Sequence, residues 1–190
     1  MVVAASNDRW AMGQDDALAL TASGNFAAFA ELYKRYLCPV YRYVRSQTPN
    51  DAVAEDITAH VFFKALSSAD TFRAEGSYRS WVFGIARNAI RTWRGGQRRA
   101  PVILEEVPES TDPLPCPATL AISKERRGSV WRAIADLSPA QREVVALHYI
   151  DEFTTEEVAE LTKRSRGAVR ILLHRARTKL RTVLEEEGLS

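Results

Sequence analysis

The sequence predicts an all-α protein with two small helical domains joined by a flexible, proline-rich linker. Apolar residues recur at helical spacing in several separate stretches. Five of the eight prolines fall within residues 100–118 and divide these stretches into two groups. The chain length agrees, because 190 residues correspond to one or two domains of about 100–200 residues each.

The first group predicts a domain over residues 15–99, after a disordered tail at residues 1–14 that has no periodicity. Its first helix starts at Phe26 and carries an apolar face formed by Phe26, Phe29, Ala30, Tyr33, Leu37, Val40, Tyr41 and Val44. Asn50 or Asp51 is expected to cap the next helix, which reaches about Leu66. The side chains that it turns inward are Val53, Ile57, Val61, Phe62 and Ala65.

A third helix is expected from Ser80, after a polar loop, and the pair Gly95-Gly96 is expected to end it. One face is apolar and another is polar and basic; the latter contains Arg87, Asn88, Arg91, Arg94 and Arg98. No acidic residue occurs between positions 77 and 104. The aromatic residues nearby are Tyr78, Trp81, Phe83 and Trp93. Cations mixed with aromatic rings bind unstacked bases, although Trp81 and Phe83 are more often core residues.

The second group predicts a domain over residues 119–186. Val130, Trp131, Ile134 and Leu137 mark one helix, and the stretch from Ser138 to Gln141 is a capping box that starts another, running to about Tyr149. Thr154 and Glu157 form a second capping box, flanked by Phe153 and Val158 as a hydrophobic staple.

The last helix is expected to begin after Ser165 as N-cap. An aliphatic stripe runs along it at Val169, Leu172, Leu173, Ala176 and Leu180. Cations cover the other face, and no acid occurs between positions 163 and 184. A short helix, a turn and a basic second helix are typical of a helix-turn-helix that enters the DNA major groove. The alternative is a solvated basic helix on an ordinary αα-corner.

Composition limits the other possibilities. The net charge of +2 decides little, whereas the separation of two basic segments by an acidic one suggests two surfaces that face nucleic acid. Cys38 and Cys116 indicate neither a zinc site nor a disulfide framework, so no metal or cofactor is expected. The three histidines are far apart and no catalytic residues are expected. No secretory signal or membrane span is visible, so a cytoplasmic protein is expected.

The order of these parts resembles the extracytoplasmic-function (ECF) group of bacterial sigma factors, over about residues 15–184. The stretch FAAFAELYKRYLCPVYRYV resembles the first helix of sigma region two, and DAVAEDITAHVFFKAL resembles its polymerase-binding helix. SYRSWVFGIARNAIRTWRGGQRR is similar to the stretch that melts and reads the −10 element. LSPAQREVVALHYIDEFTTEEVAELTKRSRGAVRILLHRARTKLR is similar to the module that reads the −35 element.

The resemblance implies a sigma factor that binds core RNA polymerase, recognises promoter DNA and directs initiation at a restricted set of promoters, without being an enzyme. The positions matching the polymerase-binding surface are Asp56, Ile57, Phe62 and Ala65. Those matching the contacts to single-stranded −10 DNA are Arg87, Asn88, Arg91 and Thr92. Those matching the helix that enters the duplex −35 element are Arg166, Arg170, Ile171, His174 and Arg175. An anti-sigma factor is a common partner in the family and would be expected to cover both DNA-binding faces.

The sequence departs from the family pattern at a few positions. Ala59-His60 stands where the family usually has Gln-Glu. Lys163 stands where glycine is common in the turn of the helix-turn-helix, so Lys163 must adopt the geometry that glycine takes freely, or the turn must differ. Arg164 replaces an apolar residue there, and Leu172 replaces a frequent arginine.

Two other classes of function remain open at this point. A repressor or activator could use the same helix-turn-helix with an N-terminal sensor or dimerisation domain, but it has no need of a second basic and aromatic helix. Alternatively, the N-terminal half could be a helical bundle that only binds other proteins. Binding of single-stranded DNA by residues 15–99 distinguishes this last possibility from a sigma factor.

Overall fold

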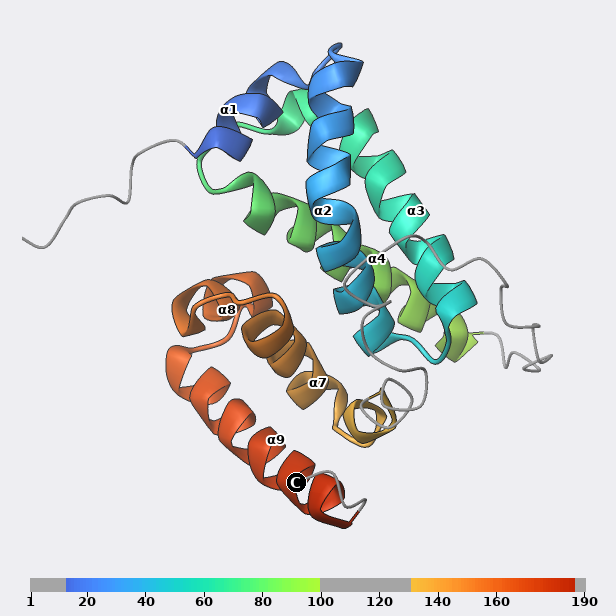
Figure 1. Ribbon diagram of the computed structural model, residues 1–190, viewed down its shortest axis with the longest axis vertical. Coiled ribbons are helices and arrows are strands. Elements are labelled where there is room, and N and C mark those ends of the chain that lie inside the picture. Colours follow the sequence, from blue (N-terminus) through green and yellow to red (C-terminus); the bar gives the residue numbers. More distant parts are fainter. Residues whose placement is uncertain (1–12, 100–130, 187–190) are drawn as a thin grey trace, which may run out of the picture.

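The computed structural model describes residues 13–99 and 131–186, and every regular element in those two ranges is a helix (Figure 1). This confirms the predicted all-α class. We call residues 14–99 the N-terminal bundle and residues 131–186 the C-terminal bundle. The predicted linker, residues 100–118, lies outside the described residues, as does most of the predicted N-terminal tail.

The helices follow one another in a simple order. The N-terminal bundle contains α1 (Gln14–Thr21), α2 (Phe26–Gln47), α3 (Asp51–Ser67), the 3-10 turn η2 (Ala69–Thr71) and α4 (Tyr78–Arg99). In the C-terminal bundle, helical residues 131–135 precede α7 (Pro139–Val145), the π-helical turn η3 (Ala146–Ile150), α8 (Thr155–Thr162) and α9 (Arg166–Glu186). None of the described helices is both long and apolar enough to cross a bilayer.

Asparagine side chains cap the starts of α2 and α3. The Asn25 side-chain oxygen accepts a hydrogen bond from the Ala28 N–H at 3.1 Å, at the start of α2. The Asn50 oxygen likewise accepts from the Val53 N–H at 2.9 Å, at the start of α3. Each oxygen satisfies one of the backbone donors that a helix start leaves unpaired. Asn50 is therefore the cap of α3, and Asp51 is its first helical residue.

Helix α1 was not predicted from the sequence, and two aspartates anchor it. Asp16 accepts a hydrogen bond from the Tyr78 backbone N–H at 2.6 Å and so satisfies one backbone donor at the start of α4 from 62 residues away. Asp15 accepts a hydrogen bond from the Tyr36 hydroxyl at 2.6 Å, which ties α1 to α2. The position of α1 therefore depends on long-range contacts and not on a local periodicity.

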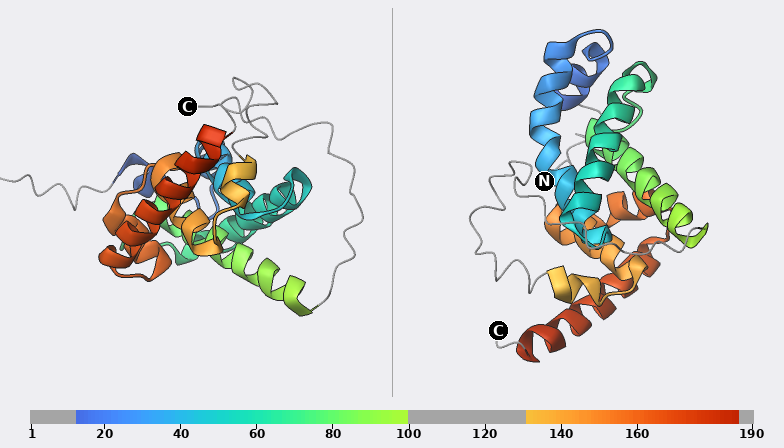
Figure 2. Two further views of the ribbon diagram at one scale, coloured as in Figure 1. Left: turned by 90° about the horizontal axis from the view of Figure 1, so that it is seen from below. Right: turned by 90° about the vertical axis from the view of Figure 1, so that its right-hand side faces the viewer.

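Helices α2, α3 and α4 pack around the core of the N-terminal bundle (Figures 1 and 2). Of the five predicted inward positions of α3, Ile57, Val61, Phe62 and Ala65 are buried and Val53 is partly buried. The expectation that Gly95-Gly96 ends the third helix is wrong, because α4 continues to Arg99. Glycine in a helix costs only about 1 kcal/mol relative to alanine, which lowers helix stability without forcing an end.

The two bundles pack against each other through α2 and α4 on one side and α7, η3 and α8 on the other. The rings of Phe83 from α4 and Phe153 from the segment before α8 meet edge to face, with centroids 4.9 Å apart. The Arg79 guanidinium lies 4.0 Å from the centroid of the same Phe153 ring. Both phenylalanines are 1% exposed, so the bundles share one continuous apolar core.

Asp151, at the end of η3, is a buried carboxylate within this junction. Its side chain has no exposed surface, and its nearest cation is the Arg42 guanidinium of α2, 3.6 Å away. This separation is too long for a hydrogen bond, and neither carboxylate oxygen has a hydrogen-bond partner. Burial raises the pKa of Asp151 to about 7, and Glu152 also raises it, against the opposing effect of Arg42 and Arg79.

The raised pKa predicts that stability depends on pH. Because the usual pKa of this group is 3.8, the folded protein binds the proton more tightly than the unfolded chain does. The contribution of Asp151 is therefore fully present below about pH 4 and is lost as the pH rises to about 7. We expect the free energy of unfolding to fall by on the order of 1 kcal/mol for each unit by which the pH rises in that window.

Urea unfolding of the wild type and of Asp151→Asn between pH 4.5 and pH 8 measures this contribution. The introduced asparagine side chain is uncharged at all of these pH values. The variant's free energy of unfolding, relative to that of the wild type, should therefore rise up to about pH 7 and then stay constant. Parallel pH profiles for the two proteins would show that Asp151 does not titrate in the folded state in this range.

Candidate nucleic-acid interface

Both predicted capping boxes of the C-terminal bundle are present. At α8 the Thr154 hydroxyl accepts from the Glu157 N–H at 3.2 Å, and a Glu157 carboxylate oxygen accepts from the Thr154 N–H at 2.8 Å. Ser138 and Gln141 make the same reciprocal pair at α7, at 3.3 Å and 3.0 Å. These local bonds fix where each helix starts.

The turn between α8 and α9 depends on Lys163. Its backbone is in the left-handed region, with φ 53° and ψ 45°, which is the geometry that glycine adopts without cost. The turn thus keeps the shape expected for a glycine at this position, although a lysine occupies it. Ser165 follows, and its hydroxyl accepts from the Ala168 N–H at 3.2 Å, which confirms it as the N-cap of α9.

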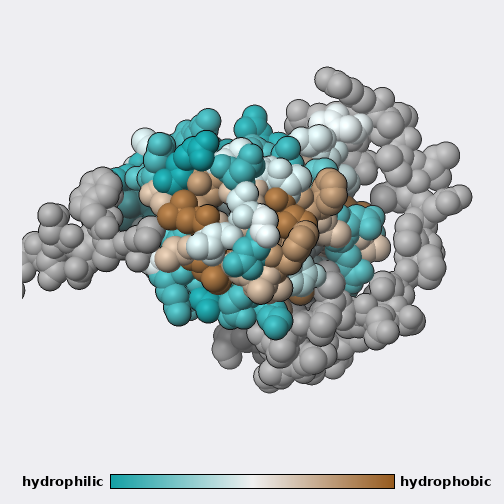
Figure 3. All heavy atoms as spheres, turned by 90° about the horizontal axis from the view of Figure 1, so that it is seen from above, coloured by the Kyte–Doolittle hydropathy of each residue, from teal (hydrophilic) through white to brown (hydrophobic). Residues whose placement is uncertain are grey.

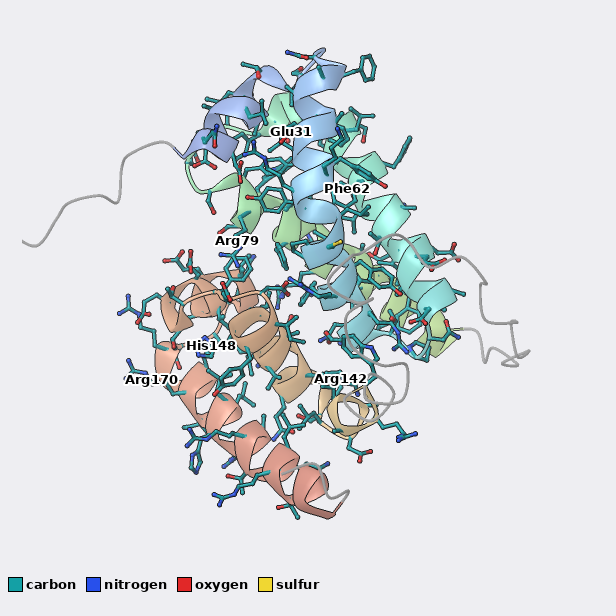
Figure 4. All side chains as sticks on the ribbon, in the orientation of Figure 1. Glu31, Phe62, Arg79, Arg142, His148 and Arg170 are labelled. Carbon is teal, nitrogen blue, oxygen red and sulfur yellow. The ribbon has the colours of Figure 1, made fainter. Side chains whose placement is uncertain are left out.

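Helix α9 packs its aliphatic stripe against α7 and leaves its basic face outward. Val169, Leu173 and Ala176 are buried, as predicted. All five residues of the −35 prediction lie on the exposed face: Arg166, Arg170, Ile171, His174 and Arg175. Arg170 extends from α9 away from the rest of the protein (Figure 4). Ile171 is 53% exposed, which makes it an apolar side chain within a surface of cations.

The four residues of the −10 prediction occur on α4 but differ in their surroundings. Asn88, Arg91 and Thr92 are exposed. Arg87 faces the C-terminal bundle, where its Nε donates to a Glu143 carboxylate oxygen at 2.8 Å and its Nη2 donates to the Thr162 carbonyl at 3.0 Å. The structure therefore leaves three of the four side chains open to solvent and occupies the fourth.

The aromatic residues near α4 are largely structural. Tyr78 and Phe83 are 2% and 1% exposed, so neither ring offers a face for a base. Trp81 packs edge to face on Phe72 and, like Trp93, is partly buried. The core alternative noted for Phe83 is therefore correct, and only the two tryptophans keep aromatic surface accessible beside the cations.

The residues of the polymerase-binding prediction are mostly inside the N-terminal bundle. Ile57, Phe62 and Ala65 are at most 7% exposed, and only Asp56 is on the surface. Figure 4 shows Phe62 between α2 and α3, where its ring meets that of Tyr33. A partner docking on α3 would meet a different set of side chains.

The exposed face of α3 contains a large apolar residue that the sequence reasoning missed. Phe63 is 70% exposed, next to the exposed Asp56, Ala59 and His60. Positions 56, 59, 60 and 63 share one helix face by spacing, opposite to the buried stripe, and that spacing could have identified the surface. Apolar surface also occurs at the end of the N-terminal bundle where α2 begins (Figure 3). There Leu20, Phe26 and Leu66 are exposed.

The described residues hold no group of three or more histidine, cysteine, aspartate or glutamate side chains that could bind a metal ion. Of the histidines, His148 is engaged by the backbone, with its Nδ1 2.8 Å from the Phe153 carbonyl oxygen. That contact joins η3 to the segment before α8.

Two family descriptions match the sequence: Sigma-70 region 2 over residues 32–100, and Sigma-70, region 4 over residues 127–180. The chain is 31% identical over 163 residues to the ECF RNA polymerase sigma-E factor of Escherichia coli strain K12, covering 81% of this chain and 85% of that protein. It is 28% identical over 168 residues to the ECF RNA polymerase sigma factor BldN of Streptomyces coelicolor. That match covers 87% of this chain but only 64% of BldN, so the chain spans less than two thirds of that relative.

Among solved structures, the chain is similar to CnrH in complex with the cytosolic domain of CnrY. The TM-score is 0.69 at 25% sequence identity, and the match covers 90% of this chain and 97% of the CnrH chain. The similarity therefore extends over both bundles and is not limited to the helix-turn-helix.

The left-handed backbone of Lys163 predicts that Lys163→Gly stabilises the protein. A non-glycine residue in this region costs about 1–2 kcal/mol, and the greater freedom of glycine in the unfolded chain offsets part of the gain. We expect the free energy of unfolding to rise by about 0.5–1 kcal/mol in urea titrations. Lys163→Ala is the control, because it removes the charge but keeps the Cβ atom. Equal effects of the two variants would attribute the change to the charge instead.

Proposed function

The chain belongs to the ECF family of RNA polymerase sigma factors, and we propose that it binds core RNA polymerase, recognises −10 and −35 promoter elements, and directs transcription initiation at a restricted set of promoters. The observation that carries this proposal is the basic outer face of α9, presented by a helix-turn-helix, in a chain that also has a second cationic helix, α4. A protein with both surfaces can hold two separate promoter elements.

The −35 element is the proposed ligand of α9. Its outer face offers Arg166, Arg170, His174 and Arg175 for phosphate oxygens and base edges. Ile171, exposed among them, fits the C5 methyl group of thymine, which is the apolar feature of the major groove. Phosphate contacts supply affinity and register, and the few base contacts supply sequence preference.

The −10 element, as single-stranded DNA, is the proposed ligand of α4. Asn88, Arg91 and Thr92 are exposed on it, with Trp81 and Trp93 partly accessible nearby. Capture of unstacked bases offsets the cost of strand opening by about 1–3 kcal/mol per stacked base. Arg87 belongs to this group in our proposal, although the C-terminal bundle occupies it in the structure.

For core RNA polymerase we propose the exposed face of α3, made of Asp56, Ala59, His60 and Phe63. Exposed apolar rings surrounded by polar residues are common anchors of protein interfaces, and Phe63 is the largest such group on this helix. Ile57, Phe62 and Ala65 would act indirectly in this proposal, by fixing α3 on the core.

The remaining parts of the proposal concern organisation and setting. Residues 100–118 link a polymerase- and −10-binding domain, residues 15–99, to a −35-binding domain, residues 119–186. The chain itself has no catalytic role and needs no cofactor, because the polymerase forms the phosphodiester bonds, and it acts in the cytoplasm. An anti-sigma factor is a further proposed partner, because such partners are common in the family; the similar protein CnrH was likewise solved with a protein partner, the cytosolic domain of CnrY.

Run-off transcription with core RNA polymerase tests the proposed function. The full chain should direct initiation from a restricted promoter set, and Phe63→Ala should lower the yield about tenfold at limiting polymerase through weaker binding. Excess core polymerase should restore that yield. Leu20→Ala, which truncates an exposed apolar residue on α1, is the matched control and should behave as the wild type. Failure of the wild type both to bind core polymerase and to initiate would refute the proposal.

A second test concerns Ile171 and uses a promoter found by run-off transcription. Replacing the thymines of its −35 element one at a time by deoxyuridine removes only a methyl group. One of these changes should weaken binding of the wild type by about 1 kcal/mol, because a buried methyl contact is lost. Ile171→Ala should bind the thymine and deoxyuridine duplexes equally. If the wild type is indifferent to every substitution, Ile171 does not contact a thymine methyl group.

A further inference from the structure

The Arg87 side chain of α4 is mostly buried where α4 meets the C-terminal bundle. Its Nε donates to Glu143 of α7 at 2.8 Å, and its Nη2 donates to the carbonyl of Thr162, the last residue of α8, at 3.0 Å. The side chains of Arg87 and Glu143 are only 15% and 14% exposed. Both acceptors thus come from the half of the chain that carries the −35 helix.

These two acceptors offer Arg87 the same chemistry as DNA does. An arginine guanidinium binds phosphate and carboxylate oxygens through the same planar array of N–H donors. Glu143 supplies the anionic oxygen and Thr162 supplies a second, neutral one. A DNA strand cannot use these two N–H donors of Arg87 until both contacts are broken, because the Nε and Nη2 donors already point at protein oxygens.

The occupied state of Arg87 is part of a larger junction. Phe153 packs on Phe83 beside it and lies under the Arg79 guanidinium. Arg42 faces the buried Asp151 across the same junction. Apolar contact and charge therefore both hold the C-terminal bundle against α4, and Glu143 is positioned by the fold and not by the ion pair alone.

The closed arrangement leaves the other DNA-binding face open. Helix α9 packs on α7, on the side of the C-terminal bundle that is turned away from α2 and α4 (Figures 1 and 2). Arg170, His174 and Arg175 are exposed in this arrangement. Packing of the C-terminal bundle on α4 therefore occupies Arg87 of the proposed −10 surface and leaves the proposed −35 surface on α9 exposed.

We propose that the C-terminal bundle is a built-in competitor of single-stranded DNA, in which Glu143 and the Thr162 carbonyl occupy Arg87 until the two bundles separate. This inference rests on the proposed function, because it assigns regulation to the proposed −10 surface. In the closed chain the duplex-binding helix is available and the single-strand surface is incomplete. Separation of the bundles on the polymerase completes that surface.

The test uses the full chain and two fluorescent probes, a single-stranded AT-rich 12-mer and a random-sequence 20-base-pair duplex, in anisotropy titrations. Glu143→Gln weakens the hold on Arg87, and it should tighten binding of the 12-mer about tenfold without changing the affinity for the duplex. Glu160→Gln is the matched control: it makes the same charge change at an exposed position of α8 and should change neither affinity. Adding Arg87→Ala to Glu143→Gln should abolish the gain.

Each of the other outcomes contradicts the proposal that Glu143 and the Thr162 carbonyl compete with single-stranded DNA for Arg87. Equal tightening by Glu143→Gln and Glu160→Gln would reflect net charge, and binding of the 12-mer equally by wild type and Glu143→Gln would show that Arg87 is not restrained. Absence of binding by Glu143→Gln also overturns the inference, since a freed Arg87 should bind. In any of these cases the run-off assay decides separately whether the proposed function stands.

Discussion

The ring of Phe153 is the contact on which both the helix-turn-helix and the junction between the bundles depend. As the residue before the Thr154 cap, it occupies the staple position of α8, and its backbone N–H donates to the Leu147 carbonyl of η3 at 2.9 Å. The same ring meets Phe83 and Arg79 of α4. Loss of its volume would leave a cavity between α4 and the segment before α8, so the orientation of α8 and the packing of the bundles are coupled through one side chain.

Features that depend on local chemistry could be predicted from the sequence, and features that depend on distant partners could not. The caps at Ser138 and Thr154 and the exposed face of α9 follow from spacing within one helix. Helix α1 was missed because its anchor at Asp16 pairs with Tyr78, 62 residues away. The Arg87–Glu143 contact was missed for the same reason, since it joins residues 56 positions apart.

The candidate site on α3 shows how two kinds of inference can disagree. Apolar spacing placed Ile57, Phe62 and Ala65 inward, and the structure buries all three. The resemblance to known relatives assigned the same residues to a docking surface. A helix has both a buried and an exposed side, so family position identifies the helix, while burial decides which side a partner can reach. On the exposed side of α3, Phe63 is the large apolar residue that a partner can reach.

Because the Tyr78 N–H donates to Asp16, the effect of an N-terminal deletion on α4 depends on whether the deletion removes Asp16. A deletion that ends before Gly13 leaves the acceptor and the rest of α1 in place. A deletion that passes Asp16 removes the acceptor of the Tyr78 N–H, and the first turn of α4 then keeps only its local cap at Ser77, whose hydroxyl accepts from the Ser80 N–H at 3.1 Å. Truncations that remove Asp16 should therefore weaken the start of α4, although the cut lies far from that helix in sequence.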